Sequence, residues 1–213
     1  MTITQNHIAE FLALCTSLIF WKDIKMGKLK FLPHFFTFIL CIELAGNYLH
    51  KIKFANFILY NFSIPLEYLF YILLFWLQGG NVLKKISRLS GFIFIAITLL
   101  YFIYLPLKDF HNNVLLGGQI IVIVCCCTYF VQLFNANEET SLLQNYFFWL
   151  SSGLLLFNLG DFVYSMLYPL IHNKGWDKFD FLFKSVNNNL LLLLYLSYII
   201  SIFMYKKKII MNA

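Results

Sequence analysis

The chain has 213 residues, of which 61% are hydrophobic, 20% aromatic and only 12% charged. Soluble domains carry about 25% charged residues and disordered chains carry few aromatic ones, so this composition excludes both classes. The net charge of +6 comes from short groups of lysines between long apolar runs. That pattern is typical of membrane-flanking charge and not of a nucleic-acid interface. The sequence therefore predicts an all-α, polytopic membrane protein.

Long apolar segments follow one another along the whole chain. A helix needs about 20 apolar residues to cross a membrane. Seven segments approach this length, covering residues 7–21, 31–49, 54–77, 89–107, 114–134, 142–170 and 181–205. The connections between them are short and polar, which leaves no room for a soluble domain. We therefore expect residues 1–213 to form a single transmembrane domain, a seven-transmembrane-helix bundle, with bundles of six or eight helices as the alternatives.

The basic residues are divided unequally between the two sides of the expected bundle. Ten lie on the side that carries residues 22–30, 84–88 and the terminal Lys206, Lys207 and Lys208, and six lie on the other side. An excess of lysine and arginine marks the cytoplasmic side. We therefore expect the N-terminus outside and the C-terminus in the cytoplasm. Lysine in great excess over arginine, together with many Asn, Ile and Phe, indicates an A/T-rich genome and favours a bacterial inner (plasma) membrane.

Polar side chains within the apolar segments are the main functional signal, because a central charged residue costs about 2.5 to 3.5 kcal/mol on insertion. With a rise of 1.5 Å per residue, most of them fall at a shared depth in the outer half of the bundle, where Gln119 joins them. Only Glu67 is expected near the midplane. The candidate ligand-binding residues are Glu43, Asn47, Asn61, Glu67, Asn158, Asp161, Asn187 and Asn188.

Two interpretations of these residues remain open. Their shared depth predicts an outward-facing polar pocket for a small molecule or a lipid. Asparagine and acidic side chains also tie helices together in membrane bundles, and Asp161 also fits the outer end of its helix. The outer histidines His7, His50, His111 and His172, with nearby aspartates, would be a third possibility as metal ligands. No ligand spacing supports such a site, so we expect neither a metal nor another cofactor.

Several classes of membrane protein can be tested against the sequence. A retinal protein needs a lysine deep in its last helix, where this chain has only Lys184 near the edge. Nucleophilic catalysis needs a base beside a serine, and no base lies at a matching depth. Gly153 and Gly160 have no counterparts in the first half of the chain, as an inverted-repeat transporter would require. An oligomeric pore or membrane effector of bacterial defence stays as the alternative, with a lipid-modifying enzyme or a transporter behind it.

Three polar motifs carry a resemblance to a known group. They are Glu43-x-x-x-Asn47, then Tyr60-Asn61-x-x-x-Pro65-x-Glu67-Tyr68, then Phe148-Trp149-x-x-x-Gly153 through Asn158-x-Gly160. With these motifs the chain resembles small seven-helix membrane proteins common in Bacteroidota, over most of its length. The resemblance implies seven helices and a role for the polar positions, and it implies no activity.

We expect the chain to bind or sense a small molecule or lipid from the outer side. Helix shifts would then be reported at the basic inner face, where Lys84, Lys85 and residues 206–208 would meet anionic lipid, a cytoplasmic protein or a second copy of the chain. Membrane lipids are the expected partners, and nucleic acid is not.

Overall fold

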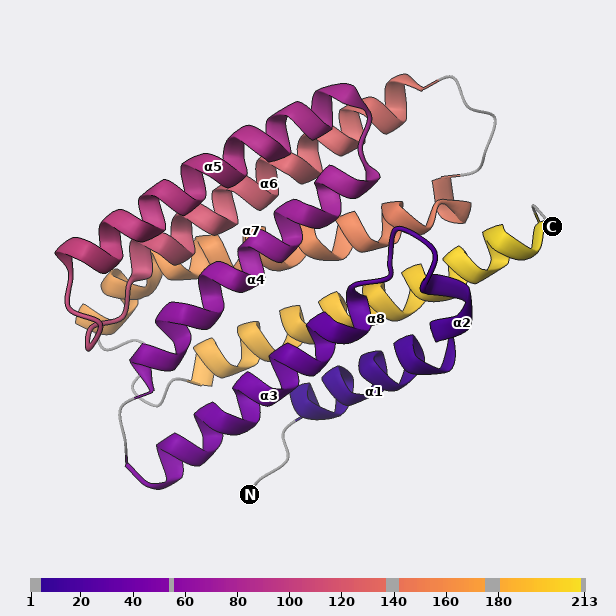
Figure 1. The fold of residues 1–213 in the computed structure, drawn as a ribbon. Coiled ribbons are helices and arrows are strands. Elements are labelled where there is room, and N and C mark those ends of the chain that lie inside the picture. The colour runs from indigo at the N-terminus through magenta and orange to yellow at the C-terminus, as the bar shows by residue number, and fades with distance from the viewer. Residues whose placement is uncertain (1–4, 54–55, 137–141, 175–180, 212–213) are drawn as a thin grey trace.

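The computed structural model describes residues 5–53, 56–136, 142–174 and 181–211, and within these ranges the chain is helical apart from short connections. The helices are α1 (Gln5–Ile19), α2 (Trp21–Ile24), α3 (Leu32–Lys51), α4 (Phe57–Gln78), α5 (Asn81–Tyr104), α6 (Asn112–Asn135), α7 (Tyr146–Asn173) and α8 (Phe181–Met211). A single turn of 3-10 helix, η1 (Leu142–Gln144), precedes α7. Figure 1 shows the long helices side by side with similar tilt.

Six of these helices are long and apolar enough to cross a membrane: α3, α4, α5, α6, α7 and α8. The expected seventh span is not confirmed, because α1 has 15 residues and ends at Ile19. At 1.5 Å per residue it is about 22 Å long, which is short of the roughly 30 Å of a bilayer core. The chain then continues into the four-residue α2 within the connection expected at 22–30.

Helix ends differ from the predicted segments where charged residues continue a helix beyond its apolar part. The fourth segment was expected from residue 89, but α5 begins at Asn81, directly after Gly79 and Gly80, both with extended ψ angles. The last segment was expected to end at residue 205, but α8 continues to Met211. Lysine and arginine are good helix formers, so they extend the helices past the part that hydropathy can detect.

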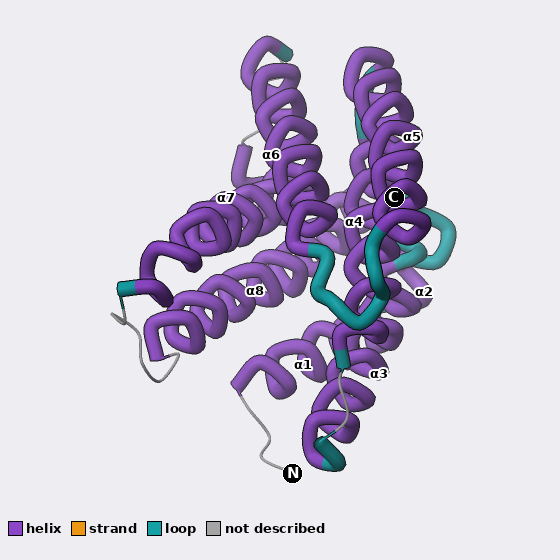
Figure 2. Tube along the Cα trace, turned by 90° about the vertical axis from the view of Figure 1, so that its left-hand side faces the viewer, coloured by secondary structure: helices purple, strands orange, loops and turns teal. Residues whose placement is uncertain are grey.

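Six of the described helices form a closed ring, and α5 lies outside it. Around the ring the neighbours are α1, α3, α4, α6, α7 and α8, and α8 returns to α1. Helix α5 packs in the groove between α4 and α6 (Figure 2). Its other face exposes large apolar side chains, as a lipid-facing surface does: Leu89, Phe92, Ile93, Leu99, Leu100 and Ile103.

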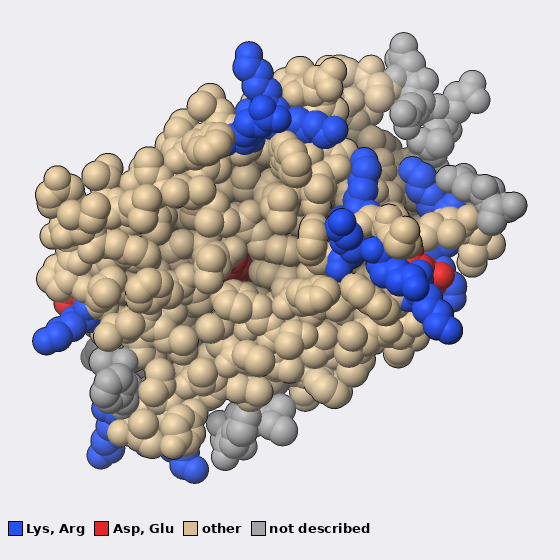
Figure 3. Space-filling model, in the orientation of Figure 1, with Lys and Arg blue, Asp and Glu red and all other residues tan. Residues whose placement is uncertain are grey.

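The two ends of the ring differ in charge. We call the end that carries residues 22–30, the start of α5 and the end of α8 the lysine-rich end, and the other the opposite end. Figure 3 shows Lys and Arg side chains gathered at the right, where α2 and the C-terminus lie in Figure 1. Fewer basic side chains lie at the left. Between the two ends the visible surface is almost free of charge, as a membrane-embedded belt would be.

The half of the ring toward the lysine-rich end is filled by aromatic rings. Phe36 of α3 packs edge-on against Tyr198 of α8, with ring centroids 5.3 Å apart. Phe75 of α4 meets Phe147 of α7 at 5.4 Å, and Phe147 meets Tyr129 of α6 at 4.8 Å. All five side chains are buried. This aromatic packing fills the centre of the ring toward the lysine-rich end.

Candidate functional site

Three carboxyl groups from three helices share one region inside the ring. Glu10 of α1 is buried, and Glu43 of α3 and Glu67 of α4 are half-buried. The charges of Glu43 and Glu67 both act on Glu10, and Glu43 also acts on Glu67. We call these three residues the carboxylate cluster. One Glu10 oxygen, Oε2, is buried without a hydrogen-bond partner.

The depths of these residues agree along the helices. Glu43 lies eight residues before the end of α3, or about 12 Å from the opposite end. Glu67 lies ten residues after the start of α4, or about 15 Å from the same end. The cluster is therefore near the middle of the spans, slightly toward the opposite end. In Figure 3 acidic atoms are visible at the bottom of a hollow near the centre of the surface, far from both charged ends.

Tyrosines surround the cluster. Tyr71 lies one turn after Glu67 on α4, and its hydroxyl donates a short hydrogen bond to Glu67 Oε1. The Tyr195 hydroxyl of α8 lies beside the Glu10 carboxyl, and both tyrosine side chains are buried. Tyr60 of α4 lies within the electrostatic reach of Glu43 and Glu10. The acids thus have neutral hydroxyl groups and aromatic rings as neighbours.

Among the residues that the structure describes, no Lys or Arg forms an ion pair with Glu10, Glu43 or Glu67. The basic neighbour is His7 of α1, whose charge acts on Glu43. His7 also shares a 2.7 Å hydrogen bond with Asn47 of α3. Glu43 and Asn47 therefore both face α1, as their spacing of four residues requires.

A second polar group joins α6 to α7 next to the cluster. Gln119 Nε2 of α6 donates a 2.5 Å hydrogen bond to Asp161 Oδ2 of α7. The Tyr68 hydroxyl of α4 lies beside Gln119, and the charge of Asp161 acts on Glu67. Polar groups within electrostatic reach of one another therefore extend across the ring from α1 through α4 to α7.

The other candidate residues make structural contacts. Asn61 is buried at the opposite end of α4, where its Nδ2 donates to the backbone oxygens of Leu107 and Asp109 at 3.2 and 2.8 Å. Its Oδ1 accepts a 3.0 Å hydrogen bond from the His111 backbone N–H. Asn61 thus fastens the connection between α5 and α6, away from the carboxylate cluster.

The remaining asparagines lie on α7 and α8. Asn158 is fully buried and donates to the Leu154 oxygen of its own helix at 2.8 Å, while its Oδ1 has no partner. Asn188 is half-buried and accepts a 2.7 Å hydrogen bond from Asn6 Nδ2 of α1. Asn187, beside it on α8, is half-buried as well. The contact from Asn6 to Asn188 joins α1 to α8 on the approach to the cluster from the opposite end.

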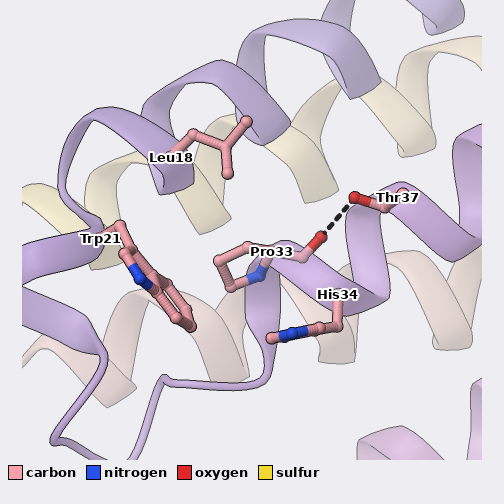
Figure 4. Close-up of a pocket in the computed structure, with 5 residues that line it drawn as sticks. All are labelled: Leu18, Trp21, Pro33, His34 and Thr37. Atoms are coloured by element: carbon pink, nitrogen blue, oxygen red, sulfur yellow. Dashed lines mark hydrogen bonds between the residues drawn. The ribbon is translucent and has the colours of Figure 1, made fainter.

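The expected pocket does not coincide with either of two hollows at the surface of the structure. One, of about 410 Å³, lies between the end of α1 and the start of α3, and Figure 4 shows Trp21 and His34 in it on either side of Pro33. The other, of about 460 Å³, lies at the lysine-rich end. Neither is lined by any of the eight candidates. In the described part of the chain, no three His, Cys, Asp or Glu side chains are placed to hold a metal ion.

Sequence reasoning missed Glu10. It lies three residues after His7, so both occupy one face of α1, and that spacing was the available signal. Asp177 and Asp180, expected near the outer histidines, lie outside the described residues, as does the side chain of His172. In comparisons with models of protein families, with curated proteins and with solved structures, this chain matches none.

Proposed function

We propose that this chain is a membrane protein that binds a small organic cation, a protonated amine or a quaternary ammonium ion, at the carboxylate cluster. The observation that carries the proposal is that Glu10, Glu43 and Glu67 lie within electrostatic reach of one another, with no lysine or arginine ion-paired to them among the described residues. The proposal keeps the bacterial inner membrane, the N-terminus outside and the ligand approaching from that side.

The charge of the site favours a cation. A carboxylate inside a low-dielectric bundle is costly unless it is paired or protonated, and three acting on one another add repulsion. A monovalent cation that enters among them pairs with one carboxylate and weakens its repulsion of the others. The unpartnered Oε2 of Glu10, on a side chain only 4% exposed, is an acceptor to which an N–H group can donate.

The chemistry of the surroundings favours an organic cation over a metal ion. Metal ions need several ligands converging within about 2.0 to 2.6 Å, and the described residues offer no such group of acids, histidines or cysteines. Aromatic faces next to carboxylates are instead the recognition chemistry of ammonium groups. Tyr71 and Tyr195 place aromatic rings next to the cluster, with their hydroxyl groups directed at Glu67 and Glu10.

Binding with a conformational response fits the packing better than passage through the chain. The ring is filled by Phe36, Tyr198, Phe75 and Phe147 between the cluster and the lysine-rich end. Toward the opposite end the neighbours are polar, with Asn47 exposed at the surface of α3. A solute arriving from that side meets polar groups first and aromatic packing beyond them.

The test is thermal unfolding of the purified protein in lipid nanodiscs with tetramethylammonium or butylammonium chloride, compared with sodium chloride at equal ionic strength. A ligand of the folded state at a hundred times its Kd stabilises by about 2.7 kcal/mol. We expect at least one ammonium salt to raise the Tm of the natural sequence. Glu67→Gln should abolish that shift. Asp109→Asn, which removes an equal charge from the exposed connection between α5 and α6, should keep it. Equal shifts in both variants, or none with either salt, would overturn the proposal.

A further inference from the structure

A second hollow of about 460 Å³ lies at the lysine-rich end, far from the carboxylate cluster. Four separate parts of the chain line it: the connection between α2 and α3, the end of α4, the start of α7, and the end of α8. The lining residues are Met26, Gly27, Lys28, Lys30, Leu77, Tyr146, Tyr205, Lys208 and Ile209. Figure 3 shows basic side chains crowded at this end of the molecule.

The hollow concentrates positive charge. Lys28 and Lys208 line it, and Lys84 at the start of α5 lies within electrostatic reach of Lys28. Partial burial lowers the pKa of Lys28, and the charges of Lys84 and Lys208 lower it further. None of the three forms an ion pair with an acid in the described ranges. Three ammonium groups from three elements thus lie within electrostatic reach of one another, and none of them is ion-paired within the described ranges.

The walls of the hollow are held in place by ring packing and a hydrogen bond. Tyr205 packs edge-on against Tyr146, with ring centroids 4.8 Å apart, and Lys208 Nζ lies 5.7 Å from the centre of the Tyr146 ring. The Tyr146 hydroxyl donates a 2.6 Å hydrogen bond to Gln78 Oε1. Gly27 admits the Tyr205 hydroxyl so closely that an added Cβ would lie 1.7 Å from it. The two tyrosines, the glycine and the glutamine thus pack into a defined wall beside the lysines.

We propose that this hollow binds a phosphate group, carried either by the headgroup of an anionic lipid or by a soluble phosphate compound. A phosphate accepts hydrogen bonds from several ammonium groups at once, and its charge relieves their mutual repulsion. The apolar side chains of Leu77 and Ile209 at the same hollow provide a surface along which an acyl chain can continue into the membrane. This proposal does not depend on the ammonium site, since it involves the other end of the ring.

The test measures lipid retention by native mass spectrometry, after reconstitution in phosphatidylcholine with or without phosphatidic acid. We expect the natural sequence to retain phosphatidic acid. A Lys28→Gln, Lys208→Gln double variant should bind it about 20- to 30-fold more weakly, because each lysine near an anionic lipid surface contributes about a fivefold share. The control is Lys51→Gln with Lys184→Gln, an equal charge change at the opposite end, and it should bind like the natural sequence.

Two further measurements identify the source of the phosphate and guard against misfolding. Displacement of the lipid by millimolar glycerol 3-phosphate would assign the site to soluble phosphate compounds, and lipid retained in its presence would assign it to the headgroup. Lys28→Arg with Lys208→Arg keeps the charge and should retain binding. Equal lipid and glycerol 3-phosphate binding by the glutamine variant and its control would overturn the proposal, as would an absence of binding of both compounds to the natural sequence.

Discussion

Gly118 of α6 lies against the Tyr68 ring of α4, next to the carboxylate cluster. A methyl group added at Gly118 would lie 2.5 Å from Cγ and Cδ2 of that ring and 2.8 Å from Cδ1. Favourable carbon contacts have separations of about 3.5 to 4.0 Å, so the ring or the helix would have to retreat by about 1 Å. Tyr68 is only 3% exposed and packs edge-on against Tyr71 and Phe94, at 5.8 and 6.0 Å. It therefore has no free space into which to retreat.

The adjacent Gly117 provides a matched control, because an added Cβ there would meet nothing within 4 Å. Alanine gains up to about 1 kcal/mol over glycine in a helix, and that gain applies to both positions. Overpacking costs about 1 to 3 kcal/mol and applies only at Gly118. We therefore expect Gly118→Ala to be less stable than Gly117→Ala by about 1 to 3 kcal/mol.

The measurement is reversible unfolding in mixed micelles with increasing dodecyl sulfate, followed by tryptophan fluorescence. The difference between the two variants cancels the helix propensity term and any general effect of the detergent. If Gly118→Ala unfolds at the same dodecyl sulfate fraction as Gly117→Ala, the close contact of α6 with Tyr68 is refuted. The position of Tyr68 beside Glu67 and Gln119 would then need revision as well.

Two other predictions concern contacts between helices. An added Cβ at Gly153 would lie 2.5 Å from Ser197 Cβ, so Gly153→Ala should destabilise the α7–α8 pair by about 1 to 3 kcal/mol. In the double variant, Ser197→Gly should recover part of this loss. Simple additivity of the two changes in the same unfolding assay would contradict this contact. Asn61→Leu removes three hydrogen bonds to the connection between α5 and α6 and should cost about 2 to 4 kcal/mol, with faster hydrogen exchange at the His111 amide. Unchanged exchange at that amide would show that Asn61 does not hold the connection.

The apolar runs predicted the six long helices because hydropathy reports directly on the part of a helix that faces lipid. They did not predict where α5 begins or α8 ends, since lysines outside the bilayer continue the helix without an apolar signal. They also could not separate a short helix from a spanning one. Residues 7–21 read as a span, yet α1 ends at Ile19, and its buried Ala9, Ala13 and Ser17 are small side chains that permit close packing.

For the candidate site, the sequence predicted how deep each residue lies along its helix but not the direction in which its side chain points. The rise per residue placed Glu43 in the outer half of the bundle and Glu67 near the midplane, and the structure brings the two within electrostatic reach of each other. The same reasoning placed Asn61 at the depth of Glu43, although its side chain is directed to the backbone near residue 109. The direction of a side chain depends on which helices are neighbours. The position of α1 between α3 and α8 is set by tertiary packing, and hydropathy and helix rise do not predict it.

The contacts divide the polar residues into two chemical groups. The amides form hydrogen bonds that tie the helices together: Asn47 with His7, Asn61 with the backbone of the α5–α6 connection, and Asn188 with Asn6. A hydroxyl or amide neighbour can satisfy the hydrogen bonds of Glu10, Glu43 and Glu67 but cannot balance a charge. The two groups should therefore separate in experiment. Substitution of an amide should change the unfolding free energy with little effect on ammonium binding, whereas substitution of a carboxyl group should remove binding even where the fold is kept.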